Sequence, residues 1–350
     1  MIIFTYFVLF FLVIRFSVTV FNFLSNPKLP AFAPTHSDLT SIVITVRNEE
    51  SNLLNLLHSI IAQEYRNIEV IIYHSALDSN DVKLVEAVCK KDPRFRLMKG
   101  PAGDYSWVTS EISGDYLLFL DSNTSIEKRF INSLVNRLKV FKIAAMSIMP
   151  NKLFESFLQR LVLPLNDFVL LNLIPLRLIK LLKSPSFLQV DNYNCLIVDA
   201  TLYRNKGWQA KIDASKGAID LIKIVKQDNF KAELLLANKL VYQVSKLSKS
   251  ELLKSVAESL KLNFGSVVIQ FVYLLLVVAG PLIIFLGIDL EIIILPIGLI
   301  FLSRIMISFM TDQNPVLNVL LHPLQMIMLV VVFIIGIQSQ LLTAIKHNKS

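Results

Sequence analysis

Residues 115–124 read DYLLFLDSNT, an apolar run that ends on an aspartate and is followed by small polar residues. Polar residues directly after a buried strand have two explanations. Asp, Ser and Asn are the usual residues of tight turns. Carboxylate and amide oxygens are also ligands that a hard divalent cation accepts. The segment by itself leaves both explanations open for Asp121 and Asn123.

Strand-like and helix-like segments alternate around this run. The strand-like segments are SIVITV (41–46), EVIIY (69–73), FRLMK (95–99) and DYLLFLD (115–121). Amphipathic, helix-like segments lie between and after them, at residues 50–64, 81–91 and 128–141. This alternation predicts an α/β domain, over residues 38–250, with a mostly parallel, Rossmann-like sheet. Ligands of such sheets bind beyond the carboxyl ends of the strands, so the residues that follow each strand are the informative ones.

The composition indicates a soluble domain joined to membrane segments. Hydrophobic residues make up 54% of the 350 residues, and the mean hydropathy is +0.57. The net charge of +8 is scattered, which suits a surface near anionic lipid headgroups better than nucleic acid. The two cysteines are far apart in the sequence, which fits a reducing compartment without disulfides.

Four apolar segments are long enough to cross a bilayer. One precedes the domain (2–24, within an expected anchor at 1–25), and three follow it, within residues 262–345, at 266–288, 290–310 and 316–342. The first has no basic n-region and no cleavage site, so it does not resemble a signal peptide. The positive-inside rule places the domain in the cytoplasm, on an inner or plasma membrane. Three following spans would then leave the basic C-terminus outside, so either one segment is re-entrant or the rule fails for this tail.

Residues 152–185 mix leucines with basic residues, and prolines divide them into pieces too short to span. We expect interfacial helices in the headgroup layer, with basic side chains reaching toward the polar surface. Helices in the core of the soluble domain are the alternative. Arg15, Arg304 and His322 lie inside the apolar segments, and we expect them to pair between helices.

The order of these features resembles the membrane-anchored branch of the family 2 glycosyltransferases, which have a GT-A fold. The resemblance is carried by SIVITVRNEESNLLNLLHSI (41–60), EVII (69–72), GDYLLFLDSNT (114–124), the stretch 175–208, and GAIDLIKIVKQDNFKAELLLANKLV (217–241). One leading and about three trailing membrane helices fit that branch as well. The resemblance therefore extends over most of the chain.

The resemblance implies an inverting transfer from a nucleotide-diphosphate sugar. Asp121 and Asn123 match the family's D-x-D motif, which binds Mg²⁺ or Mn²⁺. Asp220 matches the aspartate that acts as the general base. Thr45, Arg47, Glu49 and Asp121 match the nucleotide-sugar site, and Asn192 and Asn194 fall in the acceptor segment.

Several positions depart from the family pattern. The second D-x-D aspartate is Asn123, and the glutamate expected before Asp220 is Ile219. His74 and Ser75 stand where the family has paired aspartates, with Asp78 displaced. The basic residue usual before the fourth strand falls near Asp104. Asp220 is also explained as an ordinary residue of a helix start.

Two functions follow from these observations. The first is a membrane-bound hexosyltransferase that acts on a lipid or other amphiphilic acceptor. The alternative is a catalytically degenerate relative that serves as a membrane scaffold or partner protein. A transporter is a weaker third, because few polar residues lie in the apolar segments.

Overall fold

The computed structural model describes residues 2–33, 35–46, 52–75, 79–101, 107–181, 195–212, 219–264, 266–287 and 290–347. Its strands are β1 (Thr40–Val46), β2 (Ile68–His74), β3 (Phe95–Lys99), β4 (Tyr116–Asp121), β5 (Thr124–Ile126), β6 (Ala145–Met149), β7 (Asn151–Leu153), β8 (Cys195–Asp199), β9 (Ala232–Leu236) and β10 (Val241–Val244). The helices associated with the sheets are α2 (Leu53–Ile61), α3 (Ser79–Lys91), α4 (Val108–Glu111), α5 (Phe130–Phe141), α8 (Ala200–Asn205), α9 (Trp208–Lys211) and α10 (Ile219–Gln227). The remaining helices are α1 (Ile2–Ser25), α6 (Phe157–Val162), α7 (Pro164–Leu173), η1 (Leu176–Lys180), α11 (Lys249–Phe264), α12 (Val267–Leu274), η2 (Leu275–Ala279), α13 (Gly280–Gly287), α14 (Leu290–Thr311), α15 (Pro315–Leu320) and α16 (His322–His347).

The main sheet has seven strands in the order β3-β2-β1-β4-β8-β6-β9. Each strand except β8 runs parallel to the others, while β8 pairs antiparallel with both β4 and β6. The strands predicted at residues 41–46, 69–73, 95–99 and 115–121 are β1 to β4, in the expected parallel arrangement. The mostly parallel sheet of the predicted α/β domain is therefore confirmed.

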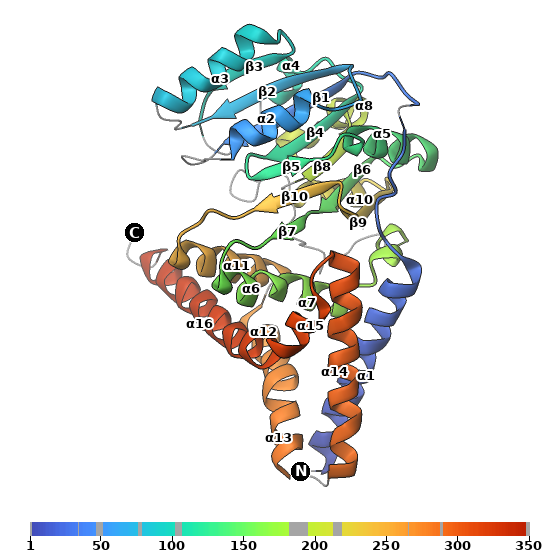
Figure 1. Cartoon of the computed structure of the whole chain (residues 1–350), viewed down its shortest axis with the longest axis vertical. Coiled ribbons are helices and arrows are strands. Elements are labelled where there is room, and N and C mark those ends of the chain that lie inside the picture. Colours follow the sequence, from blue (N-terminus) through green and yellow to red (C-terminus); the bar gives the residue numbers. More distant parts are fainter. Residues whose placement is uncertain are drawn as a thin grey trace.

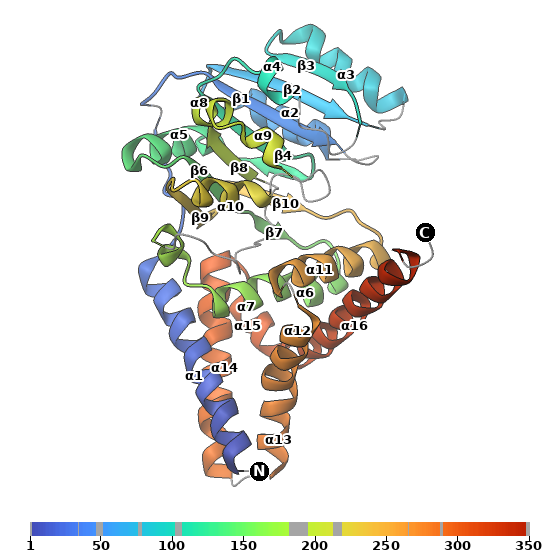
Figure 2. The same cartoon turned by 180° about the vertical axis from the view of Figure 1, so that it is seen from behind.

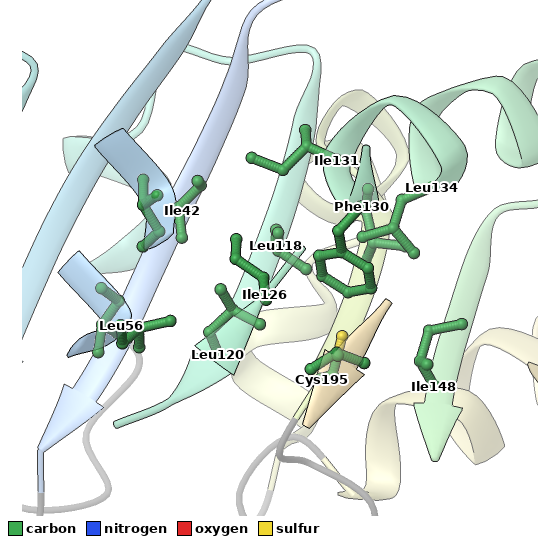
Figure 3. Packing of buried hydrophobic residues seen from close by; sticks show 14 of the residues in the cluster. Ile42, Leu56, Leu118, Leu120, Ile126, Phe130, Ile131, Leu134, Ile148 and Cys195 are labelled. Atoms are coloured by element: carbon green, nitrogen blue, oxygen red, sulfur yellow. The ribbon is translucent and has the colours of Figure 1, made fainter. Parts of the chain in front are cut away.

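Apolar residues cover both faces of this sheet. On one face, Ile42 and Leu118 pack against α2 and α5, in a cluster that Figure 3 shows with Leu56, Phe130 and Leu134. On the other face, the opposite set of strand residues packs against α4, α8, α9 and α10. Each buried aliphatic or aromatic side chain contributes about 1.5–3 kcal/mol, so this two-sided burial holds the strand ends in fixed positions.

A small second sheet, in the order β5-β10-β7, joins the domain to the helical part. Strand β5 begins three residues after Asp121 and pairs antiparallel with β10. Strand β10 then leads directly into α11. Figures 1 and 2 show α6, α7 and α11 between the sheets and the long helices. The segment expected to form interfacial helices is thus α6, α7 and η1, in a layer at the boundary of the two parts.

Within the described residues, three helical segments are long and apolar enough to cross a membrane: Ile3–Ser25, Val267–Phe285 and Ile293–Thr311. They correspond to α1, the α12-η2-α13 unit and α14, and they extend away from the sheets in Figure 1. The π-helical turn η2 ends two residues before Pro281, whose missing N–H interrupts the regular helix ladder.

The last apolar segment is divided into α15 and the longer α16. The end of α14 is held at the domain, because Asn151 of β7 donates a hydrogen bond to the carbonyl of Thr311 at 2.8 Å. Helix α16 packs along α11, with Gly336 against Ala257, and both views place its end beside α11. This segment therefore begins and ends on the side of the sheets, as the re-entrant alternative requires.

Candidate active site

A row of side chains crosses the carboxyl edge of the main sheet. In the parallel register, Thr45 of β1 is paired with Tyr73 of β2 on one side and with Asp121 of β4 on the other. Paired residues of neighbouring strands point to the same face of a sheet. The three side chains therefore share the face that is covered by α4 and α8–α10. They lie where open α/β sheets bind ligands.

Asp121 ends its strand in a hydrogen-bonded turn. Its Oδ1 accepts a bond from the backbone N–H of Asn123 at 2.8 Å, and its carbonyl accepts one from the Thr124 hydroxyl at 2.7 Å. The carbonyl of Asn123 accepts from the N–H of Val244 at 2.9 Å, which ties the turn to β10. The turn explanation of this segment is confirmed, and the Asp121 side chain is half-buried.

The donor set at this turn suits a cation that is bound mainly by its substrate. Within the described ranges, no group of three or more His, Cys, Asp or Glu side chains could hold a metal ion. Mg²⁺ characteristically uses one or two carboxylates together with water and substrate phosphates. One carboxylate and one amide, at positions 121 and 123, fit a cation that is bound mainly by substrate phosphates and water. They are too few for a site made only of protein ligands.

The other predicted site residues lie outside the described residues or at their margins. Arg47, Glu49, Asn192 and Asn194 are outside them, as are Asp78 and Asp104. Their described chain neighbours, however, lie at the carboxyl edge. Val46 ends β1 there, and Cys195 begins β8 opposite Leu120, one residue before Asp121.

Asp220 is described in its backbone only. It lies in the first turn of α10, which packs on β6 and β9 and leads into β9. A helix that leads into a parallel strand runs antiparallel to it, so the start of α10 lies toward the carboxyl edge.

An aromatic pair next to this row did not follow from the sequence analysis. The rings of Tyr73 and Trp107 stack with centroids 4.5 Å apart and 21° between their planes. The Tyr73 hydroxyl donates to the carbonyl of Pro101 at 3.0 Å. A Cβ at Gly100 would collide with the Tyr73 ring, so glycine is needed for this packing. The sequence shows a tyrosine at the end of the predicted strand EVIIY. It contains no local pattern that would predict contact with a tryptophan 34 residues later.

His74 occupies one of the positions where paired aspartates were expected. It is the last residue of β2, is 5% exposed, and points to the sheet face opposite Tyr73. Burial lowers its pKa, and the charge of Lys99, its neighbour on β3, lowers it further. The imidazole is therefore neutral at pH 7 and supplies no negative charge to the site.

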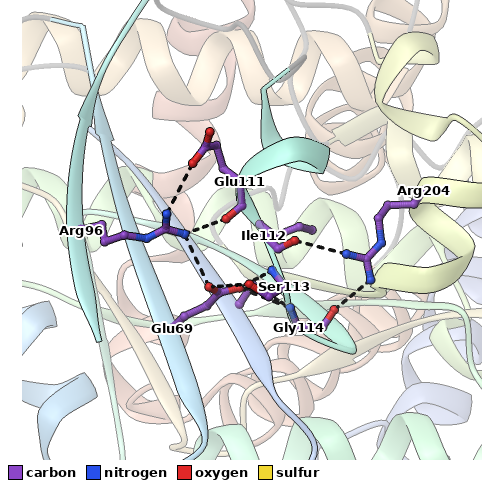
Figure 4. Close-up of polar contacts among 8 residues, drawn as sticks. Glu69, Arg96, Glu111, Ile112, Ser113, Gly114 and Arg204 are labelled. Atoms are coloured by element: carbon purple, nitrogen blue, oxygen red, sulfur yellow. Dashed lines mark hydrogen bonds and ion pairs between the residues drawn. The ribbon is translucent and has the colours of Figure 1, made fainter. Parts of the chain in front are cut away.

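A charged network lies at the opposite, amino edge of the same strands (Figure 4). The Glu69 carboxylate accepts hydrogen bonds from the Ser41 hydroxyl at 2.5 Å and the Ser113 N–H at 2.6 Å, and Arg96 pairs with it at 3.5 Å. This network fixes the entry of the chain into β4. It lies at the other end of the strands from Asp121 and therefore serves the fold.

Comparison with known proteins identifies the domain that carries this edge. Residues 41–177 match the family model described as glycosyl transferase family 2. Residues 41–177 are a family 2 glycosyltransferase domain. The matched region includes Thr45, Tyr73 and Asp121 and continues to the start of η1.

Curated relatives of this family 2 domain are glycosyltransferases by name. An uncharacterized glycosyltransferase of Haemophilus influenzae is 31% identical over 110 residues, which cover 29% of this chain and 44% of that protein. Glycosyltransferase GlyG of Streptococcus pneumoniae is 25% identical over 108 residues, which cover 29% of this chain and 36% of that protein. The matched part thus spans less than half the length of these relatives.

Among solved structures, a mannosyltransferase resembles nearly the whole chain. The mannosyltransferase PcManGT from Pyrobaculum calidifontis, in complex with GDP-Man and Mn²⁺, has a TM-score of 0.54 at 13% sequence identity. The similarity covers 95% of this chain and 99% of that chain. At this identity it shows a shared fold, and the family 2 domain therefore has the expected GT-A fold.

Proposed function

We propose that this protein is a membrane-bound hexosyltransferase. It moves a sugar, with inversion, from a nucleotide-diphosphate donor to a lipid or other amphiphilic acceptor. The observation that carries the proposal is the row Thr45–Tyr73–Asp121 at the carboxyl edge of a family 2 domain, joined to helices long enough to span a membrane. The domain then lies on the cytoplasmic side of an inner or plasma membrane, where nucleotide sugars are available.

Different residues bind different parts of the donor. Thr45, Arg47 and Glu49 bind the nucleotide, as the family resemblance implies. Tyr73 is paired with Thr45 and is buried, and it supports the partly exposed Trp107 ring, which offers an aromatic surface to a nucleobase. Asp121 and Asn123 would hold Mg²⁺ or Mn²⁺. When bound, the cation supplies positive charge that stabilises the leaving diphosphate.

The acceptor side is formed by residues from the second half of the domain. Asp220 accepts the proton of the attacking hydroxyl and must lie within hydrogen-bond reach of it. Asn192 and Asn194 orient the acceptor. The helices α6, α7 and α11 lie between this domain and the long helices, which fits an acceptor presented at the bilayer surface.

The experiment is a donor-turnover assay. Purified protein is incubated with UDP-, GDP- and other nucleotide sugars, Mn²⁺ and a lipid extract, and release of the nucleoside diphosphate is measured. We expect turnover of one donor, and a loss of at least about a hundredfold for Asp220→Asn. Asp312→Asn, at an exposed ion pair with Lys239, is the matched control and should retain activity. Turnover that is unchanged in Asp220→Asn would remove the general-base role.

The scaffold alternative is favoured by one structural observation. A buried, neutral histidine stands where paired aspartates were expected, beside Lys99. A scaffold would fold and insert normally but would bind no nucleoside diphosphate, with or without Mn²⁺.

A further inference from the structure

A cavity of about 450 Å³ lies among the helices, away from the edge that carries Asp121. Its wall is apolar and comes from α1, α7, the end of α11, α12 and η2, with Phe11, Leu173 and Leu276 among its residues. Its volume is in the range of small-molecule sites. Ile269 and Val272 of its wall are 54% and 43% exposed, so the cavity opens on the outer face of α12, where lipid would lie.

Two buried arginines lie near this cavity, and neither has a carboxylate partner among the residues that the structure describes. Arg15 is 4% exposed and Arg304 is 1% exposed. Arg304 donates to the neutral groups of His322 at 3.0 Å and Gln325 at 2.5 Å. The nearby carboxylate of Asp167 is bonded to Lys152 at 2.6 Å and to Gln313 at 2.7 Å. The described side chains therefore leave a surplus of buried positive charge, which is unfavourable unless an anion compensates it.

Several buried donors around Arg15 also lack acceptors among the described residues. They are Nε of Arg15, the hydroxyl of Tyr273 and Nε2 of Gln270. Tyr273 lines the cavity, and the Arg15 guanidinium lies 5.5 Å from its ring and 5.8 Å from the ring of Phe11, which also lines the cavity. Gln270 lies one helical turn before Tyr273. Buried donors are nearly always bonded in proteins, so a set of unused donors beside a surplus of positive charge fits an acceptor-only anion.

The level of the arginines indicates where the anion comes from. Both guanidinium groups lie over the ring of Phe168 in α7, at 5.0 Å for Arg15 and 3.9 Å for Arg304. Helix α7 belongs to the layer between the sheets and the long helices (Figure 2). The cationic side of the cavity is therefore at the level expected for headgroups of the leaflet that faces the domain.

We propose that this cavity binds one anionic phospholipid of that leaflet. An acyl chain lies against the apolar wall, and the phosphate oxygens accept hydrogen bonds from Arg15, Tyr273 and Gln270. Asn263 lines the cavity, and its Oδ1, which has no hydrogen-bond donor among the described residues, accepts a bond from a headgroup hydroxyl. This proposal does not depend on sugar transfer, because it concerns binding alone.

The test uses delipidated protein of full length in a non-ionic detergent. Binding of phosphatidylglycerol and of phosphatidylcholine with the same acyl chains is measured by native mass spectrometry. We expect phosphatidylglycerol to bind at least about tenfold more tightly, as charge-assisted hydrogen bonds imply. Arg15→Met should remove this preference. Equal affinities for the two lipids in the wild-type protein would overturn the proposal.

A second variant keeps the test decisive if Arg15→Met does not fold. Ile269→Trp adds bulk at the exposed mouth of the cavity and leaves Arg15 in place, so it should weaken phosphatidylglycerol binding about tenfold or more. Ile294→Trp is the matched control, because Ile294 is 73% exposed on α14 and does not line the cavity. Equal lipid binding by the two tryptophan variants would also overturn the proposal.

Discussion

Asp121 shows how one residue serves both the fold and the proposed site. Its Oδ1 holds the turn through the N–H of Asn123, and the carboxylate as a whole provides the charge that a cation requires. The sequence allowed both explanations, and they are compatible because a carboxylate has more acceptor positions than the turn uses. An amide at position 121 would retain the turn acceptor and lose only the charge. Asp121→Asn therefore separates the two roles.

His74 is a residue whose environment could not be read from the sequence. Its burial and its position beside Lys99 depend on β2 lying between β1 and β3, which is a long-range arrangement. The sequence showed only that a histidine stands where the family has an aspartate. What the structure adds is a lowered pKa and its cause.

The lowered pKa of His74 predicts a pH dependence of stability. The unfolded chain takes up a proton near the ordinary pKa of 6.5, and the folded protein does so only at lower pH. The contribution of His74 is therefore complete above pH 6.5 and is lost as the pH falls below it. We expect the thermal midpoint to drop between pH 7.5 and 5.5, and to drop less in His74→Gln. The same drop in both proteins would contradict this assignment.

At the scale of elements, local patterns predicted β1 to β4 and the helices between and after them. They could not predict that β8 inserts antiparallel between β4 and β6, because no local residue signals which distant strand it pairs with. The sequence analysis predicted one apolar segment at residues 316–342, whereas the structure has two helices there. Pro315 instead begins α15 and Pro323 lies in the first turn of α16, positions where a missing N–H breaks no hydrogen bond.

A buried ion pair connects α5 to β9, the edge strand of the main sheet. Arg137 donates to both oxygens of Glu233, at 3.0 and 3.2 Å, and Lys180 of η1 lies 3.3 Å from the same carboxylate. The side chains of the pair are 9% and 6% exposed. The Glu233 carboxylate of β9 therefore holds both α5 and η1 in place.

We predict that Glu233→Gln destabilises the fold by about 3–5 kcal/mol, because it leaves a buried guanidinium without its counter-charge. Thermal unfolding in detergent measures the loss. Glu64→Gln is the control, since Glu64 forms an exposed pair with Arg129 at 3.5 Å and should change stability by less than about 1 kcal/mol. Equal effects of the two substitutions would show that burial does not strengthen the pair.

At the scale of the whole molecule, the structure offers a solution to the conflict in the predicted topology. Two long helical units follow the domain, and the α15–α16 segment then returns to the side of the sheets. The basic C-terminal residues therefore need not lie opposite the basic domain. The lengths of the apolar segments could be predicted from the sequence. The packing of α16 on α11 could not, because it is a tertiary contact that composition does not determine.

We propose that the carboxyl edge at Asp121 binds a nucleoside diphosphate together with a divalent cation. Isothermal titration of the detergent-solubilised protein with UDP and GDP, with and without Mn²⁺, tests this claim most directly. We predict binding of at least one of them that requires Mn²⁺, and a loss of at least about tenfold in affinity for Asp121→Asn at an unchanged thermal midpoint. A folded protein that binds neither nucleotide in the presence of Mn²⁺, or an Asp121→Asn variant that binds as tightly as the wild type, would contradict this proposed binding site.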